Sequence, residues 1–270
     1  SKTFEVRAEG IAVQLSQDGQ IIGIRLGRES AVRPVRGATA VAGCRTKGKV
    51  SRYELEQEGI EFKRNLVQED SGSRCTLVER FMPSEDSIRW EIEIRGGQEP
   101  WSAGIETRLA WDEPEAAKVW TAWGDHRPKN TPGWCDPLLP APFANLELVY
   151  GARRYSDPKA ISIPLVTVLD EANDTALSLA LSPEDLILDM KLDITEEGEL
   201  VFSRTKHRIS AERPVRFAMD LVAHPADWRG GLGWMVRRYP AFFEPPNPAA
   251  HGMAGCGAYS SSDAENMDAE

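Results

Sequence analysis

Most of the first 224 residues fall into short segments in which apolar and polar side chains alternate with a period of two. The segment Ser87–Ile94 is the clearest example, because Ile88, Trp90, Ile92 and Ile94 point one way while the charged residues between them point the other. A strand of an antiparallel sheet has this pattern when one of its faces lies in the core and the other faces water. The pattern therefore predicts strands, not helices, for most of the chain.

Turn signals separate such segments at short intervals. Gln17–Gly19 lies between two alternating segments, which predicts a hairpin over residues 11–26. Pro164 interrupts a strongly β segment and predicts a bulge or an edge position there. The predicted strands are Ile11–Leu15, Gln20–Leu26, Ile60–Val67, Arg74–Phe81, Ser87–Ile94, Gly104–Trp111, Ile161–Leu169, Thr175–Leu181, Leu186–Ile194, Glu199–Thr205 and Pro214–Ala223.

This spacing predicts an all-β fold, a large two-sheet antiparallel β-sandwich. After His224 the apolar period changes to three and four, which predicts a helix over Trp228–Phe243 that closes the sandwich. Pro240 kinks or ends this helix, and three glycines weaken it unless it approaches another backbone closely. The face that needs a partner comprises Trp228, Leu232, Met235, Val236, Tyr239 and Phe243.

We divide the chain into residues 1–224 as the β domain, 225–248 as a helical linker and 249–270 as the start of a truncated second domain or a disordered tail. Gly257–Ser261 reads as an apolar strand without neighbours in this sequence. Residues 112–143 break the strand rhythm as a long loop rich in proline and tryptophan. Long loops in compact domains are more often functional than idle.

The composition narrows the class of partner. The chain has 270 residues, 41% of them hydrophobic, and a net charge of −10. This charge disfavours nucleic acids and anionic membrane surfaces, which attract basic proteins. No apolar segment is long enough to span a bilayer. Cys44, Cys75, Cys135 and Cys256 form no C-x-x-C pair, so we expect free thiols, although disulfides remain open.

The predicted sandwich, aromatic helix and following strand together resemble the N-terminal part of multidomain glycoside hydrolases. In α-galactosidase-like and endo-α-N-acetylgalactosaminidase-like enzymes, a galactose-mutarotase-like supersandwich precedes a (β/α)8 barrel that carries the catalytic carboxylates. The segments that carry the resemblance are Ser162–Pro164, Leu177–Asp185, Trp228–Phe243 and Gly257–Ser261.

The resemblance implies a non-catalytic domain that packs on a catalytic barrel of the same polypeptide, in a periplasmic or secreted protein. It transfers no catalytic residue to this chain, because the barrel strands that carry them lie outside the sequence. No cofactor is implied. The acidic residues Asp185, Asp189 and Asp193 are too far apart along the chain to chelate a metal alone, and we interpret them as a solvated face.

Candidate substrate-binding residues come from the aromatic loop and the tail. Sugars stack on flat aromatic faces, while carboxylates and amides bind their hydroxyl groups. The alternative is that the tryptophans pin the loop to the sandwich or to the barrel, and that the tail is a loose end. The candidates are Trp120, Trp123, Asp125, His126, Arg127, Trp134, Tyr259 and Asp263.

Three functions follow from these features. The first is the non-catalytic sandwich of a glycoside hydrolase, and the second is an autonomous carbohydrate-binding module. The third is an aldose epimerase, which needs a histidine acid and a carboxylate base. His126, His207 and His224 are scattered along the sequence, and we interpret the last two as a strand-end residue and a helix-start residue.

Overall fold

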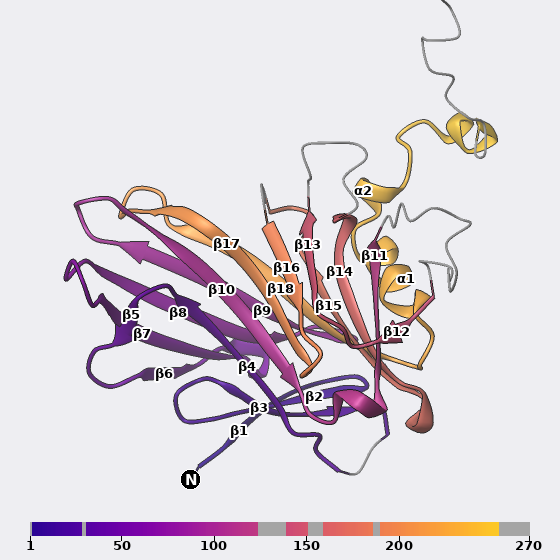
Figure 1. Ribbon diagram of the computed structural model, residues 1–270, viewed down its shortest axis with the longest axis horizontal. Coiled ribbons are helices and arrows are strands. Elements are labelled where there is room, and N and C mark those ends of the chain that lie inside the picture. Colours follow the sequence, from indigo (N-terminus) through magenta and orange to yellow (C-terminus); the bar gives the residue numbers. More distant parts are fainter. Residues whose placement is uncertain (1, 29–30, 124–138, 151–158, 186–189, 254–270) are drawn as a thin grey trace, which may run out of the picture.

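A computed structural model describes residues 2–28, 31–123, 139–150, 159–185 and 190–253, with the side chains of Trp123 and Met253 excepted. Within these residues the chain is built almost entirely from strands (Figure 1). The all-β class predicted from the alternating pattern is therefore confirmed. The strands are β1 (Phe4–Ala8), β2 (Ile11–Leu15), β3 (Ile21–Leu26), β4 (Val35–Val41), β5 (Cys44–Thr46), β6 (Ser51–Glu54), β7 (Ile60–Gln68), β8 (Arg74–Pro83), β9 (Ser87–Gly96), β10 (Trp101–Trp111), β11 (Lys118–Trp123), β12 (Ala141–Pro142), β13 (Leu146–Tyr150), β14 (Ala160–Asp170), β15 (Thr175–Leu181), β16 (Met190–Ile194), β17 (Glu199–Ile209) and β18 (Val215–His224).

The helical segments are short and lie between strands or after the last one. The 3-10 turns are η1 (Glu56–Glu58), η2 (Pro114–Ala116), η3 (Glu171–Asn173) and η4 (Pro248–Met253). Two α-helices follow β18, namely α1 (Arg229–Arg238) and α2 (Pro240–Phe243). The predicted helix is thus confirmed and is interrupted at Tyr239, immediately before the proline that was expected to kink it.

The strands pair into one curled sheet whose two halves face each other. One half runs β7–β8–β9–β18–β15–β14–β11, and the other runs β1–β2–β3–β4–β10–β17–β16–β13. The halves meet where β13 pairs with β14, and this pair is parallel. All the other strand pairs of the described residues are antiparallel. The hairpin of β2 and β3 is one example.

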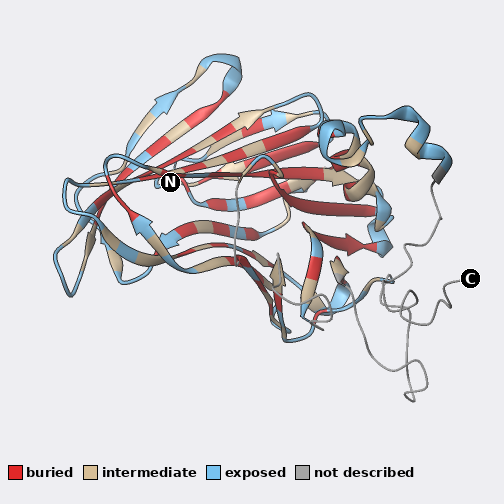
Figure 2. Ribbon diagram, turned by 90° about the horizontal axis from the view of Figure 1, so that it is seen from above, coloured by how far each residue is buried: buried red, intermediate tan, exposed pale blue. Residues whose placement is uncertain are grey.

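Alternation along the strands places the main core between the two halves (Figure 2). Trp90, Phe62 and Phe81 are among its largest fully buried side chains, and Trp90 stacks on Phe81 with 5.3 Å between ring centroids. The bulge predicted around Pro164 is also present. The register between β11 and β14 shifts between Ile161 and Val166, and the pairing of β14 with β15 begins only at Leu165.

A second, smaller core lies between α1 and the outer face of β14, β15 and β18. Every residue of β15 is buried, because one of its faces contributes to the main core and the other lies under the helix. The predicted helix face is correct for Trp228, Leu232, Met235, Tyr239 and Phe243, which all pack in this second core. Trp234 was missed in that prediction, although it is 3% exposed and lies in the same core.

Polar contacts fix the end of α1 to the sheet. The Tyr239 hydroxyl donates to Asp220 at 2.7 Å and accepts from Arg89 at 3.1 Å. The Trp234 indole N–H donates to Asp86 at 2.8 Å. Burial raises the pKa of Asp220 despite the opposing effects of Tyr239 and Arg89. No helix in the described part of the chain is long and apolar enough to cross a membrane.

Candidate functional site

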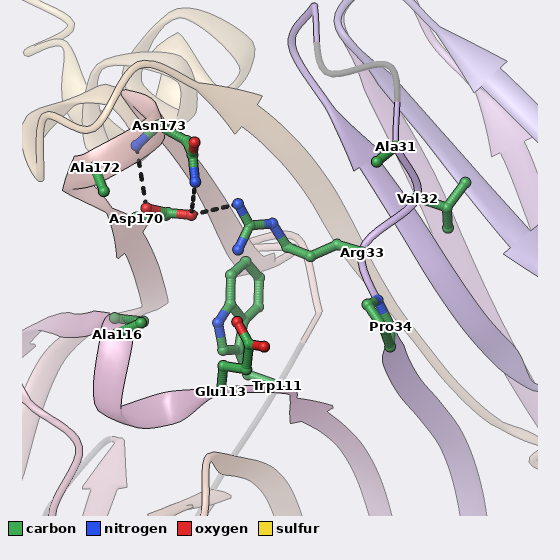
Figure 3. Close-up of a pocket in the computed structure, with 11 residues that line it drawn as sticks. Ala31, Val32, Arg33, Pro34, Trp111, Glu113, Ala116, Asp170, Ala172 and Asn173 are labelled. Carbon is green, nitrogen blue, oxygen red and sulfur yellow. Dashed lines mark hydrogen bonds and ion pairs between the residues drawn. The ribbon is translucent and has the colours of Figure 1, made fainter.

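A cavity of about 480 Å³ opens where three chain segments meet at one end of the sandwich (Figure 3). The first segment, residues 31–34, leads into β4, and the second runs from the end of β10 through η2. The third joins β14 to η3. Cavities of this size fall within the range that holds small organic ligands.

Each polar group of the cavity has a local reason for its position. Two backbone hydrogen bonds between Arg33 and Ile24, with N–O distances of 2.8 and 2.9 Å, form an isolated β-bridge that holds Arg33 beside β3. Asp170 ends β14 and caps η3, where its carboxylate accepts from the Asn173 backbone N–H at 3.2 Å and from the Asn173 side-chain amide at 2.7 Å. Asx caps of this kind stabilise the first turn of a helix. The cap therefore fixes the carboxylate at the wall of the cavity.

An ion pair between Arg33 and Asp170 crosses the cavity wall, and the Arg33 guanidinium lies 5.1 Å from the centroid of the Trp111 ring. Figure 3 shows Arg33 reaching from its strand to Asp170 above the indole. Burial acts to raise the pKa of Asp170, but hydrogen bonds from Asn173 and Arg33 outweigh it and hold the pKa below its ordinary value. Asp170 is thus kept ionised, which suits binding better than proton transfer.

Glu113 adds a second carboxylate to the lining. It has a left-handed backbone conformation with φ of 56° and precedes the first turn of η2. Its side chain is exposed and forms no ion pair with another described residue. Together, an indole, a guanidinium, an amide and two carboxylates are the groups with which proteins bind the hydroxyl groups and C–H faces of sugars.

Most of the residues predicted as sugar-binding fall outside the described part of the chain. This applies to Asp125, His126, Arg127 and Trp134 in the loop and to Tyr259 and Asp263 in the tail. Trp123 ends β11, and its side chain is not described. These residues therefore remain a prediction.

Trp120 is the one predicted site residue whose side chain is described. It is 3% exposed, and its ring lies 4.9 Å from the ring of Trp228, between the sheet and α1. In this structure the ring contacts protein and offers no open face to a sugar. The interpretation of the aromatic segment as a packing element holds for this residue.

The described histidines lie away from the cavity. The interpretation of His224 as a helix-start residue is wrong, because His224 is the last residue of β18 and α1 begins only at Arg229. The ring of His224 is covered by α1. Its Nδ1 donates to the Pro225 carbonyl at 2.8 Å, and its Nε2 therefore accepts from Ser178 at 2.7 Å. Burial lowers the pKa of His224. His207 lies on β17 and contacts its neighbour's carbonyl.

No group of three or more His, Cys, Asp or Glu side chains gathers as a metal site among the residues that the structure describes. Asp185 accepts from the Ala218 backbone N–H at 2.8 Å, and Asp193 lies opposite Glu147 on paired strands. Burial raises the pKa of both carboxyl groups. Asp189, the third member of the predicted acidic face, lies outside the described residues.

Sequence reasoning missed the cavity because its residues, from Ala31 to Asn173, are separated by up to 142 positions. Arg33 and Pro34 lay between predicted strands, and Asp170 followed one directly. The available signal was that Trp111 ends one predicted strand and Asp170 directly follows another, since side chains at strand ends often meet at a sheet edge. The pairing of those two ends could not be derived without the topology.

No protein-family model matches the chain, and no curated protein matches it by sequence. Solved structures match it by fold. The GalM/aldose epimerase homologue from C. elegans superimposes with a TM-score of 0.57 at 8% identity, covering 84% of this chain and 100% of its own. The Slr1438 protein from Synechocystis sp. PCC 6803 has a TM-score of 0.54 at 8% identity, covering 84% and 96%.

The α-N-acetylgalactosaminidase NagBb from Bifidobacterium bifidum matches with a TM-score of 0.52 at 10% identity. The match covers 88% of this chain but only 38% of NagBb. At such identities the likeness defines the fold alone. The chain has a galactose-mutarotase-like β-sandwich, a fold found both as whole chains and as one part of a longer enzyme.

Proposed function

We propose that this chain is the non-catalytic β-sandwich of a glycoside hydrolase, and that it binds carbohydrate in the cavity between Arg33, Trp111, Glu113 and Asp170. The observation that carries the proposal is the fixed, ionised state of Asp170, which Arg33 and Asn173 hold beside an indole. A preorganised set of polar groups binds a ligand at low entropic cost. Such a set does not supply a proton donor.

The proposed partner of the sandwich is a catalytic barrel of the same polypeptide. The aromatic helix α1 packs on the sandwich, and the α2 segment after it leaves Phe242 54% exposed near the point where a next domain would begin. The match to part of an α-N-acetylgalactosaminidase supports this arrangement. The aromatic loop and the tail, including His126, Trp134, Tyr259 and Asp263, are proposed to contribute to the cleft between the two domains.

Calorimetry with the isolated chain tests the carbohydrate site. We expect a panel of neutral mono- and oligosaccharides to contain at least one ligand, and Glu113→Asn to weaken its binding about tenfold, or about 1.4 kcal/mol. Asparagine tolerates the left-handed backbone at this position, so the fold is retained. Glu115→Asn, an exposed change in the same turn outside the cavity, is the matched control.

Equal effects of the two variants would contradict the assignment of the cavity, and no binding to any saccharide would contradict the binding function. The barrel is tested separately by the reading frame after Glu270. Strands alternating with helices that bear carboxylates at strand ends support it, and a stop codon directly after Glu270 contradicts it.

The fold of the C. elegans homologue keeps an aldose epimerase as the second candidate. Among the described residues, however, the ring of His224 is covered and engaged at both nitrogens, so it does not suit the role of an epimerase acid. We therefore choose His126 as the histidine to test in this role. An anomer-exchange assay with several aldoses distinguishes the two functions. A rate above that of buffer, abolished by His126→Ala, would favour the epimerase.

A further inference from the structure

A second cavity, of about 540 Å³, is lined by residues of β7, β8 and β9 and by the segment that follows β5. Figure 1 shows these strands at the end of the sandwich opposite to α1. The cavity lining includes three cations, Lys47, Arg74 and Arg95, and no carboxylate. The whole chain carries a net charge of −10, so the positive charge at this cavity is opposite in sign to the net charge of the molecule. A cavity lined by one sign of charge attracts ligands of the opposite sign.

The positive charge of the cavity is only weakly neutralised by its surroundings. Lys47 and Arg74 are exposed and form no ion pair with any residue that the structure describes. Arg95 contacts Glu93 at 3.2 Å, but the same carboxylate also contacts Arg216 at 3.1 Å and Arg80 at 3.8 Å. Arg80 has a closer partner in Glu61 at 2.6 Å, so Glu93 is shared mainly between Arg95 and Arg216. Arg95 is therefore only partly neutralised, and Lys47 and Arg74 add to the positive charge at the cavity.

Strand register explains why Arg74 and Arg95 lie on the same face of the sheet. Asn65, Thr76 and Arg95 are aligned across β7, β8 and β9, so their side chains share a face. Leu66 and Cys75 are paired on the opposite face and are buried at 6% and 5% exposure. The apolar side chain on the face of the cations is that of Val67, which is paired with Arg74 and also lines the cavity. The volume exceeds what a small inorganic anion fills.

Polar amide groups and an open rim complete the cavity. The Asn65 side-chain oxygen accepts from the Thr76 hydroxyl at 3.4 Å, which leaves its amide N–H groups available as further donors. Gly48, with φ of 82°, and Gly97 both border open space, since a side chain added at either would meet no atom within 4 Å. The rim is thus wide enough to admit a ring-sized ligand.

We propose that this cavity binds an acidic saccharide, a sugar whose carboxylate or sulfate group lies among Lys47, Arg74 and Arg95. Guanidinium groups bind the oxygens of carboxylate and sulfate groups through paired hydrogen bonds, and the ring of the sugar would contact Val67. The site is separate from the cavity at Asp170. It goes beyond the proposed binding of neutral carbohydrate and does not depend on it.

Calorimetry with the full chain tests the proposal, using glucuronic acid, a short oligouronide, a sulfated glucose, neutral glucose and inorganic sulfate. We expect at least one of the acidic sugars to bind at least tenfold more tightly than glucose and than inorganic sulfate. The uronides and the sulfated sugar distinguish the two sources of the oxyanion. The affinity should also fall as NaCl is raised from 50 to 200 mM, because exposed charges are screened by salt.

The Lys47→Gln/Arg74→Gln double variant should lose at least tenfold in affinity for the acidic sugar. The Lys49→Gln/Arg36→Gln double variant carries the same change in net charge on exposed residues outside the cavity and should bind as the unmodified chain does. Circular dichroism and a thermal melt establish that both variants are folded.

Three outcomes would overturn the proposal. They are equal affinity for glucose and the acidic sugars, equal affinity for inorganic sulfate and the acidic sugars, or an equal loss in the two double variants. Glu113→Asn separates this site from the proposed carbohydrate cavity. That variant should leave acidic-sugar binding unchanged, so either site can fail while the other is retained.

Discussion

Arg64 occupies an inward-facing position of β7, between the buried residues Phe62 and Leu66. Its side chain is 7% exposed and pairs with Glu79 of β8, which is fully buried. Glu79 also accepts from the Trp90 indole N–H at 3.1 Å. A charged pair in the core is retained only when both charges are satisfied, since a single buried charge is costly. The three residues therefore act as one polar unit inside an apolar core.

For single residues, we predict that Glu79→Ala lowers the free energy of unfolding by about 3–5 kcal/mol, because it leaves the Arg64 guanidinium buried without its partner. The double variant Arg64→Met/Glu79→Leu removes both charges and should lose less, although Trp90 then lacks its acceptor. Urea unfolding followed by tryptophan fluorescence measures both. A double variant that is less stable than Glu79→Ala would show that the pair itself contributes net stability.

Helix α1 shows why its glycines are needed where they are. A β-carbon added at Gly231 would lie 2.1 Å from the Ser178 Oγ, and one added at Gly230 would lie 2.2 Å from the His224 Nδ1. Ser178 also contacts Thr167 at 2.7 Å, so this chain of hydroxyl groups and imidazole lies directly beneath the helix. The close approach expected from the sequence is present, and it explains a helix that is otherwise weakened by glycine.

Two substitutions in α1 distinguish the two reasons for a glycine in this helix. One tests whether the helix lies too close to β15 for a side chain, and the other tests the cost of glycine to helix stability. Gly231→Ala should destabilise the protein by about 1–3 kcal/mol, because the added methyl group overlaps Ser178. Gly233→Ala should instead stabilise it by about 0.5–1 kcal/mol, since only the flexible end of Arg237 lies near that position. Thermal melts of both variants provide the measurement. Stabilisation by both would mean that α1 does not lie as close to β15 as the structure has it.

At the scale of the whole molecule, the sequence predicted those strands whose residue pattern is clearly apolar on one or both faces. Ser87–Ile94 and Thr175–Leu181 were found from alternation or continuous apolar character, and both are strands. Strand β4 was missed because glycine, alanine and threonine at positions 37–40 give little contrast between its faces. The cavity at Asp170 was missed for a different reason. It depends on which strand ends meet, and that is a property of the topology, not of any local segment.

The last prediction concerns how the two cores depend on each other across the molecule. Deleting residues 227–270 removes α1 and uncovers the apolar outer face of β14, β15 and β18, including Trp120 and Leu165. Deleting residues 245–270 retains α1 and α2 and serves as the control. Because a large exposed apolar patch promotes association, the longer deletion should lower the melting temperature and produce oligomers in light scattering. If the two deletions melt together and stay monomeric, α1 is an appendage, and the sandwich is complete without it.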